Sequence, residues 1–200
     1  MKTLQLPLLL IALLALISAC GTTPPSDYYL LSAQAGAAPT GQTPSLGVGP
    51  ISVPEYLNRN SMVYNRSGNK LDVATYARWA EPLEAGITRV LSLNLAKNLN
   101  TEDIQDFPWH ARRAPDYSVT VRVLELDANN SRARLVAEWS LRDHSEDGQV
   151  IRRISQLEIP TGGELTPNQV AQSFSTLLGQ LSAKISAAIE DSMSEQASAA

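Results

Sequence analysis

Residues 117–142 read YSVTVRVLELDANNSRARLVAEWSLR, and this stretch decides the fold. Apolar residues occupy every second position in its first half and again in its second half: Tyr117, Val119, Val121 and Val123, then Ala133, Leu135, Ala137, Trp139 and Leu141. A period of two predicts strands with one buried and one solvated face. The intervening Asn129-Asn130 is typical of a turn, so the stretch predicts an antiparallel pair.

Further strands are predicted on both sides of this pair. Residues 149–159 follow the turn signal Glu146-Asp147-Gly148, and would complete an antiparallel meander with one solvated face. Arg152-Arg153 breaks its alternation and suggests a bulge or an edge. Nearer the N-terminus, short strands are expected at 46–53, 61–65 and 70–73.

Two helices are predicted from apolar residues that recur every three or four positions. One begins at Pro82 and carries Leu83, Ile87, Val90, Leu91 and Leu95 on one face. The other carries Val170, Phe174, Leu177, Leu178, Leu181, Ile185 and Ile189. Thr166 and Gln169 form a capping box at its start, with Pro167 at the first helical position.

The order of strands, helix, three strands and helix predicts an α+β fold. We expect an antiparallel sheet with two helices packed on one face, a two-layer sandwich. This domain would cover residues 46–192, with 193–200 as a disordered tail. A domain of this length can bury a core of its own.

The N-terminus carries the features of a lipoprotein signal peptide. Lys2 is followed by an apolar run over 4–17, and Ile17-Ser18-Ala19-Cys20 resembles the lipobox of bacterial lipoproteins. The resemblance implies cleavage after residue 19, with a diacylglycerol and an N-acyl chain on Cys20, and no other cofactor. A plain signal peptide or a signal anchor is the alternative, but Cys20 is the only cysteine. Bacterial lipoproteins with Asp directly after the lipidated cysteine tend to stay in the inner membrane. This chain has Gly21 there instead, which points to the outer membrane, with the domain facing the periplasm.

The segment after the lipidation site is expected to be a flexible tether. Residues 20–45 are rich in Thr, Pro, Ser, Ala and Gly, and fully extended they would span roughly 80 Å. Within them Tyr28-Tyr29-Leu30-Leu31 forms an aromatic and aliphatic island. It is interpreted as a short strand or a segment docked on the domain, or alternatively as a contact for a membrane or a partner.

Composition argues against several function classes. The net charge is -4 and no basic run is present, which argues against nucleic acid as a partner. The two histidines, His110 and His144, lie in polar surroundings and are interpreted as surface residues. No Gly-x-Ser-x-Gly elbow, phosphate-binding glycine loop or Cys/His ligand set occurs, so we expect neither an enzyme nor a metal site.

Two groups of residues are candidates for binding. The first lies around the polar turn 58–60 and before the first helix, and would expose apolar side chains to a partner: Tyr56, Leu57, Met62, Tyr64 and Trp79. Packing on the core is the alternative interpretation. The second group would share the solvated face of the sheet: Arg122, Arg132, Arg134 and Arg142. These arginines could contact lipid headgroups or an acidic partner. The alternative interpretation is an ordinary solvated face.

Four motifs together resemble a known family. They are Tyr28-Tyr29-Leu30, the stretch ISVPEYL at 51–57, Met62-Val63-Tyr64, and Trp79-Ala80-Glu81-Pro82-Leu83 at the start of a helix. The combination is similar to the ABC-type transport auxiliary lipoproteins. The resemblance implies an outer-membrane lipoprotein that works with a mammalian-cell-entry (MCE) domain protein in lipid transport between two membranes. It also implies a fold like the N-terminal domain of TolB.

Three functional hypotheses follow. The first is a non-enzymatic accessory lipoprotein, anchored through Cys20 and bound to an MCE-domain protein, for which homo-oligomerisation is plausible. The second is a carrier module that holds an acyl chain in an apolar cavity between sheet and helices. The third is an envelope hydrolase, which would need a histidine with a carboxylate and a hydroxyl within hydrogen-bond reach.

Overall fold

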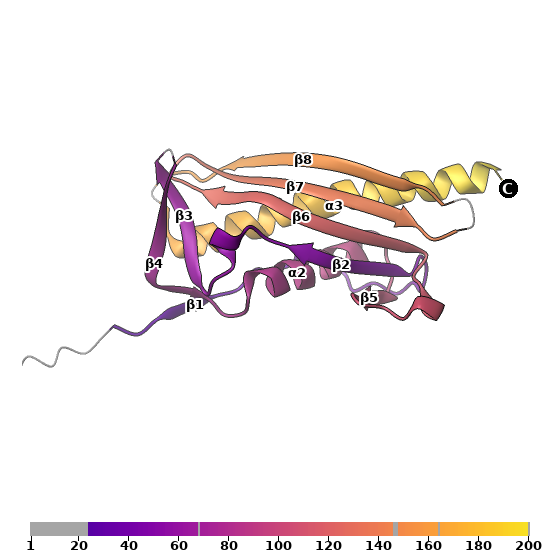
Figure 1. The fold of residues 1–200 in the computed structure, drawn as a ribbon, viewed down its shortest axis with the longest axis horizontal. Coiled ribbons are helices and arrows are strands. Elements are labelled where there is room, and N and C mark those ends of the chain that lie inside the picture. The colour runs from indigo at the N-terminus through magenta and orange to yellow at the C-terminus, as the bar shows by residue number, and fades with distance from the viewer. Residues whose placement is uncertain (1–23, 68, 146–147, 164, 200) are drawn as a thin grey trace, which may run out of the picture.

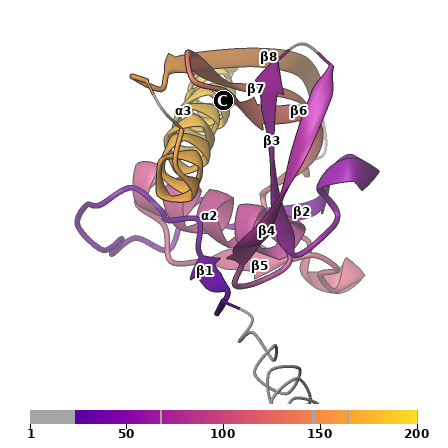
Figure 2. The same cartoon turned by 90° about the vertical axis from the view of Figure 1, so that its left-hand side faces the viewer.

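The computed structural model describes residues 24–67, 69–145, 148–163 and 165–199; the predicted signal peptide and Cys20 lie outside this range. A five-stranded sheet curves around two helices (Figures 1 and 2). Its strands, in spatial order, are β5 (Ile104–Asp106), β2 (Leu46–Ser52), β6 (Tyr117–Ala128), β7 (Arg132–Asp143) and β8 (Val150–Pro160). The predicted α+β class is confirmed.

The antiparallel meander of β6, β7 and β8 is also confirmed. Val121 lies opposite Trp139, and Leu141 lies opposite Ile151. The turn between β6 and β7 is held by the Asn129 side chain, whose Oδ1 accepts hydrogen bonds from the backbone N–H groups of Ser131 (2.9 Å) and Arg132 (3.0 Å). An asparagine that bonds the backbone two residues on is the reason this residue type favours turns.

The sheet is mixed, whereas the sequence predicted it to be antiparallel throughout. β2 runs parallel to both β5 and β6, with Val48 opposite Val119. The chain leaves β2 and passes through the hairpin of β3 (Ser61–Ser67) and β4 (Lys70–Trp79) and through α2 (Leu83–Asn98) before it returns to β5 and β6. A long crossover with a helix allows parallel pairing, which a hairpin cannot provide.

The second helix, α3 (Pro167–Ala199), lies on the same concave face of the sheet as α2. Its capping box is present: the Thr166 N–H donates to Gln169 Oε1 (2.8 Å), and the Gln169 N–H donates to Thr166 Oγ1 (3.3 Å). α3 continues through the region predicted as a disordered tail, because Gln196 bonds to Ser145 Oγ (3.3 Å) and Tyr117 Oη (3.4 Å). No helix of the described residues has the length and hydropathy to cross a membrane.

A small three-stranded sheet closes one end of the molecule, at the left of Figure 1. Its spatial order is β1 (Asp27–Tyr29), β4 (Lys70–Trp79) and β3 (Ser61–Ser67). β3 and β4 form an antiparallel hairpin, whereas β1 joins β4 in parallel. Two 3-10 turns lie elsewhere, η1 (Glu55–Leu57) and η2 (Ala111–Arg113). The far end of the molecule holds the C-terminus of α3.

Candidate functional site

The N-terminal segment, residues 24–45, lies along the folded domain. Its first part is strand β1, in which Tyr28 is the register partner of Arg78. The Arg78 Nε donates a hydrogen bond to Ser26 Oγ (3.2 Å), and the Ala80 N–H donates to the Tyr29 carbonyl (2.9 Å). The segment is therefore held on the domain from Ser26 onward.

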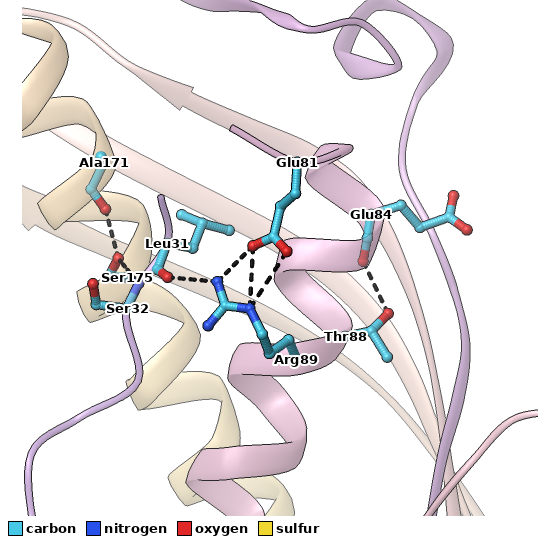
Figure 3. A network of polar contacts seen from close by, with 8 residues as sticks. All are labelled: Leu31, Ser32, Glu81, Glu84, Thr88, Arg89, Ala171 and Ser175. Atoms are coloured by element: carbon cyan, nitrogen blue, oxygen red, sulfur yellow. Dashed lines mark hydrogen bonds and ion pairs between the residues drawn. The ribbon is translucent and has the colours of Figure 1, made fainter. Parts of the chain in front are cut away.

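Leu31 and Arg89 make the central contact of this site (Figure 3). The Leu31 side chain is only 2% exposed and packs in the core. Its carbonyl accepts a hydrogen bond from Arg89 Nη2 (2.9 Å), and the same guanidinium pairs with Glu81 Oε1 (2.5 Å). Arg89 lies on α2 and Glu81 directly before it, so one arginine ties the segment to the start of this helix.

Both helices contribute further polar contacts. The Ser32 N–H donates to Ser175 Oγ on α3 (3.0 Å), and that hydroxyl donates to the Ala171 carbonyl (2.6 Å; Figure 3). On α2, the Oδ1 of Asn94, a residue that is 1% exposed, accepts the Gln34 N–H (2.8 Å). A buried polar side chain needs a partner, and here the segment's backbone supplies one.

The rest of the segment is also bonded to the domain. Lys97 Nζ donates to the Ala35 carbonyl (2.6 Å), and the Thr40 N–H donates to Asn100 Oδ1 (3.0 Å). At its end, Ser45 and Asp116 exchange two bonds, each from the backbone N–H of one to the side chain of the other (both 2.8 Å). From Ser26 to Ser45 the structure therefore has a segment bonded to the domain, where a flexible tether was predicted. Only the six peptide units from Cys20 to Ser26 separate the predicted anchor from the domain.

We call Arg78, Arg89, Asn94, Lys97 and Ser175 the docking site for this segment. Sequence reasoning missed all five. Asn94 carried a signal, because it stands seven residues after Ile87 and three after Leu91 in the apolar stripe of α2. A polar residue at a core position of a helix indicates a specific partner.

Three of the five residues predicted to bind a partner lie in the core instead. Leu57 is 2% exposed, Met62 is fully buried and Trp79 is 4% exposed. The Trp79 ring stacks on Phe174 of α3, with 6.1 Å between the ring centroids. The alternative of a hairpin packed on the core describes these three residues, so they offer no surface to a partner.

Tyr56 and Tyr64 are half-buried. Burial raises the pKa of the Tyr56 phenol, and the nearby carboxylates of Asp127 and Glu125 raise it further, against a hydrogen bond with the Leu126 backbone that lowers it. Tyr56 thus packs η1 against the end of β6. Of the predicted partner residues, these two tyrosines alone keep accessible surface.

The four arginines do share the outer face of the sheet. Three of them pair with neighbouring carboxylates: Arg122 with Glu138, Arg132 with Glu158 (2.7 Å) and Arg134 with Glu125 (3.5 Å). Arg142 is exposed near the end of β7. Exposed pairs of this kind contribute little stability, and they leave this face close to neutral. Among the described residues of this face, arginines and carboxylates thus alternate.

The hydrolase hypothesis is tested by a hydroxyl–histidine pair at the far end of the molecule. Ser118 Oγ lies 2.8 Å from His144 Nε2. Burial and the charge of Arg142 lower the pKa of His144, against Asp143, which raises it. Ser118 is only 5% exposed, and no carboxylate hydrogen bond to this imidazole occurs among the described residues. This pair therefore does not supply an accessible nucleophile. The described residues also contain no group of three metal ligands.

Among the described residues, the space between the sheet and the helices has no room for an acyl chain. The α3 side chains that face the sheet have no accessible surface at all: Phe174, Leu177, Leu178, Leu181 and Ile185. On the sheet, Leu126, Leu135 and Ala137 are likewise fully buried. A cavity wide enough for a hydrocarbon chain would give its lining side chains accessible surface. The carrier hypothesis therefore finds no cavity between sheet and helices in this conformation.

Comparison with known proteins places this architecture in a family. The model for the ABC-type transport auxiliary lipoprotein component matches residues 28–186. The chain belongs to this family. The match begins within β1 and so includes the docked segment from Tyr28 onward. As an ABC-type transport auxiliary lipoprotein, the chain is an auxiliary component of a transport system, and the family is not one of enzymes.

Two relatives agree with this assignment, and two solved structures share the fold. The chain is 31% identical over 136 residues to the intermembrane transport lipoprotein PqiC of Escherichia coli (strain K12), over 66% of this chain and 70% of PqiC, and equally to PqiC of Shigella flexneri. A crystal structure of XCC0632 from Xanthomonas campestris has a TM-score of 0.64 at 17% identity, over 86% of this chain and 99% of that chain. A crystal structure of an uncharacterized protein has a TM-score of 0.67 at 22% identity, over 83% of this chain and 99% of that chain. These two structures support the fold alone.

Proposed function

We propose that this auxiliary lipoprotein is the outer-membrane subunit of an intermembrane lipid-transport system. It is anchored by a diacylglycerol and an N-acyl chain on Cys20, faces the periplasm, and binds an MCE-domain protein of the same system without catalysing a reaction. The likeness to PqiC, an intermembrane transport lipoprotein, supports the transport role. The lipobox at residues 17–20 supports the anchor.

One observation carries this proposal: the docking of the N-terminal segment. Because Arg78 bonds Ser26 and Arg89 bonds the Leu31 carbonyl, the anchored end of the chain is fixed beside the β3–β4 hairpin. The C-terminus of α3 lies at the opposite end of the molecule (Figure 1). A helix of 33 residues is about 50 Å long, so that end is held well away from the anchor. This geometry suits a subunit that presents one end to a partner.

A binding role also agrees with the chemistry of the fold. The sheet and helices pack tightly, and the Ser118–His144 pair offers no accessible nucleophile. We therefore assign the nucleotide hydrolysis that drives an ABC system to another chain.

The proposal is tested by crosslinking in native envelopes. The full-length lipoprotein and a Cys20→Ala form would carry a photoreactive amino acid at Ser198, on the last turn of α3, or at Ile154, exposed on β8. We expect mass spectrometry to identify an MCE-domain protein crosslinked in an anchor-dependent manner, more from position 198 than from 154. Recovery of lipid without a protein partner would support the carrier module instead. Recovery of neither would reject the adaptor role.

A further inference from the structure

An apolar surface surrounds the point where the chain leaves the domain toward Cys20. Tyr28 is 66% exposed, Leu30 54% and Tyr76 42%. Leu31 faces the core, so alternation along the strand directs Tyr28 and Leu30 outward. The same reasoning applies to β4, where Ala77 is buried and Tyr76 lies on the other face. Further along β4, Val73 and Leu71 are also exposed, at 49% and 40%.

This surface lies across the end of the molecule. Figure 2 looks onto that end and shows the β3–β4 hairpin spanning it, with β1 beside β4. Parallel pairing places Tyr28 next to Arg78, two residues from Tyr76. The side chains of Tyr28 and Tyr76 therefore come from the neighbouring strands β1 and β4 and share one outer face. Leu30 directly follows β1, and we call the exposed surface of these three residues the end face.

The length of chain between Cys20 and the domain limits how far this apolar surface can lie from the membrane. Ser26 is the first of the described residues with a side-chain bond to the domain, and six peptide units separate it from Cys20. Even fully extended, these units span about 20 Å. Part of that distance is used in crossing the headgroup layer, which is roughly 5–8 Å thick on each side of a bilayer. Tyr28, two residues beyond Ser26, is thus confined to the neighbourhood of the membrane surface.

We propose that the end face is a membrane-contact surface, on which Tyr28, Leu30 and Tyr76 rest against the lipid leaflet that holds the acyl chains of Cys20. The inference rests on the proposed lipidation. Tyrosine is enriched at membrane interfaces because its ring enters the apolar boundary while its hydroxyl stays among the headgroups. The charged residues of β1 and β4 are two of each sign, Asp27 and Asp72 against Lys70 and Arg78, so the contact depends on apolar side chains.

The test uses the lipidated protein in vesicles of phosphatidylethanolamine and phosphatidylglycerol. Since acylated Cys20 has no free thiol, a single introduced cysteine is the only site for a thiol-reactive fluorophore. Tyr28→Cys and Tyr76→Cys report on the end face. Ile154→Cys and Ser198→Cys are matched controls: the first replaces an exposed apolar residue elsewhere, and the second marks the far end.

Spin-labelled lipids then quench any fluorophore that touches the leaflet. We expect quenching at positions 28 and 76 to exceed that at 154 and 198 by about threefold or more. Equal quenching at all four positions, with the protein still bound to vesicles, would overturn the membrane contact and leave the anchor intact. Self-quenching at 28 and 76 that grows with protein density, without lipid quenching, would assign the end face to contacts between copies and overturn the inference.

Failure of the anchor itself would look different. Without acyl chains on Cys20, the protein would separate from the vesicles on flotation, and the Cys20 thiol would itself react with the fluorophore. That result would reject the proposed lipidation, whereas the quenching ratio addresses the end face alone.

Discussion

Replacing Arg89 by methionine should loosen the N-terminal segment without unfolding the domain. The change removes the donor to the Leu31 carbonyl (2.9 Å) and the ion pair with Glu81 (2.5 Å). The two side chains are 40% and 29% exposed, so solvent screens the pair and its contribution is below about 1 kcal/mol. The hydrogen bond to the carbonyl adds about 1 kcal/mol. Together they hold the segment by about 1–2 kcal/mol, a factor of roughly 5–30 in its opening equilibrium.

Hydrogen exchange of single amides measures this opening. The Ser32 and Gln34 N–H groups donate to Ser175 Oγ and Asn94 Oδ1, so their exchange reports on the segment directly. In R89M we expect both amides to exchange about 5–30 times faster, while amides in β7 keep their protection.

Two variants complete this experiment. Glu81→Gln keeps the Arg89 bond to Leu31 and should accelerate exchange less than R89M does. Arg113→Met removes an exposed arginine from η2 and should leave both amides unchanged. If Ser32 and Gln34 exchanged within twofold of the parent protein in R89M, the claim that this arginine holds the segment would be wrong.

Three further predictions concern the domain. Thr166→Ala removes the capping box and should lower the free energy of unfolding by about 1 kcal/mol, which a thermal melt would show as a Tm lower by about 2–4 °C. Thr176→Ala changes an exposed threonine within α3 and should lower the Tm by less. Trp79→Ala deletes a core ring and should lower the urea-derived free energy of unfolding by about 3–5 kcal/mol; a cost under 1 kcal/mol would contradict its placement. The pKa of His144 is lower in the folded state than its ordinary 6.5, so the unfolded state takes up the proton first. Stability should therefore decrease as the pH falls below about 6.5, and urea midpoints of His144→Gln should show less of this decrease.

The elements that could be predicted from the sequence are those specified by local pattern. Alternation over 117–141 predicts β6 and β7, because side chains on a strand with one wet face must change polarity at every residue. Thr166 and Gln169 predict the start of α3, because both bonds of a capping box form within four residues. Pairing between distant segments has no such signature. The parallel neighbours of β2 were therefore missed.

The docking site was missed for the same physical reason. Residues 24–45 are poor in large apolar side chains, and that composition is typical of a flexible linker. Their order comes from partners far along the chain: the Ser32 N–H bonds a hydroxyl 143 residues away, and the Gln34 N–H an amide 60 residues away. Leu31 was the one apolar anchor visible beforehand, as part of the island that was interpreted as a strand or a docked segment.

Docking changes what the proposed lipid anchor would do to this domain. A free tether over 20–45 would reach roughly 80 Å and would leave the orientation of the domain open. With the segment bound from Ser26, the remaining chain reaches about 20 Å, less than half the roughly 50 Å length of α3. A short connection alone still permits the domain to lie flat on the membrane. The apolar end face favours one orientation of the domain, because contact of Tyr28 and Tyr76 with the leaflet directs α3 away from the membrane. Position and orientation thus depend on different residues, Arg78 and the rest of the docking site for the first and the two tyrosines for the second, and they can be altered separately.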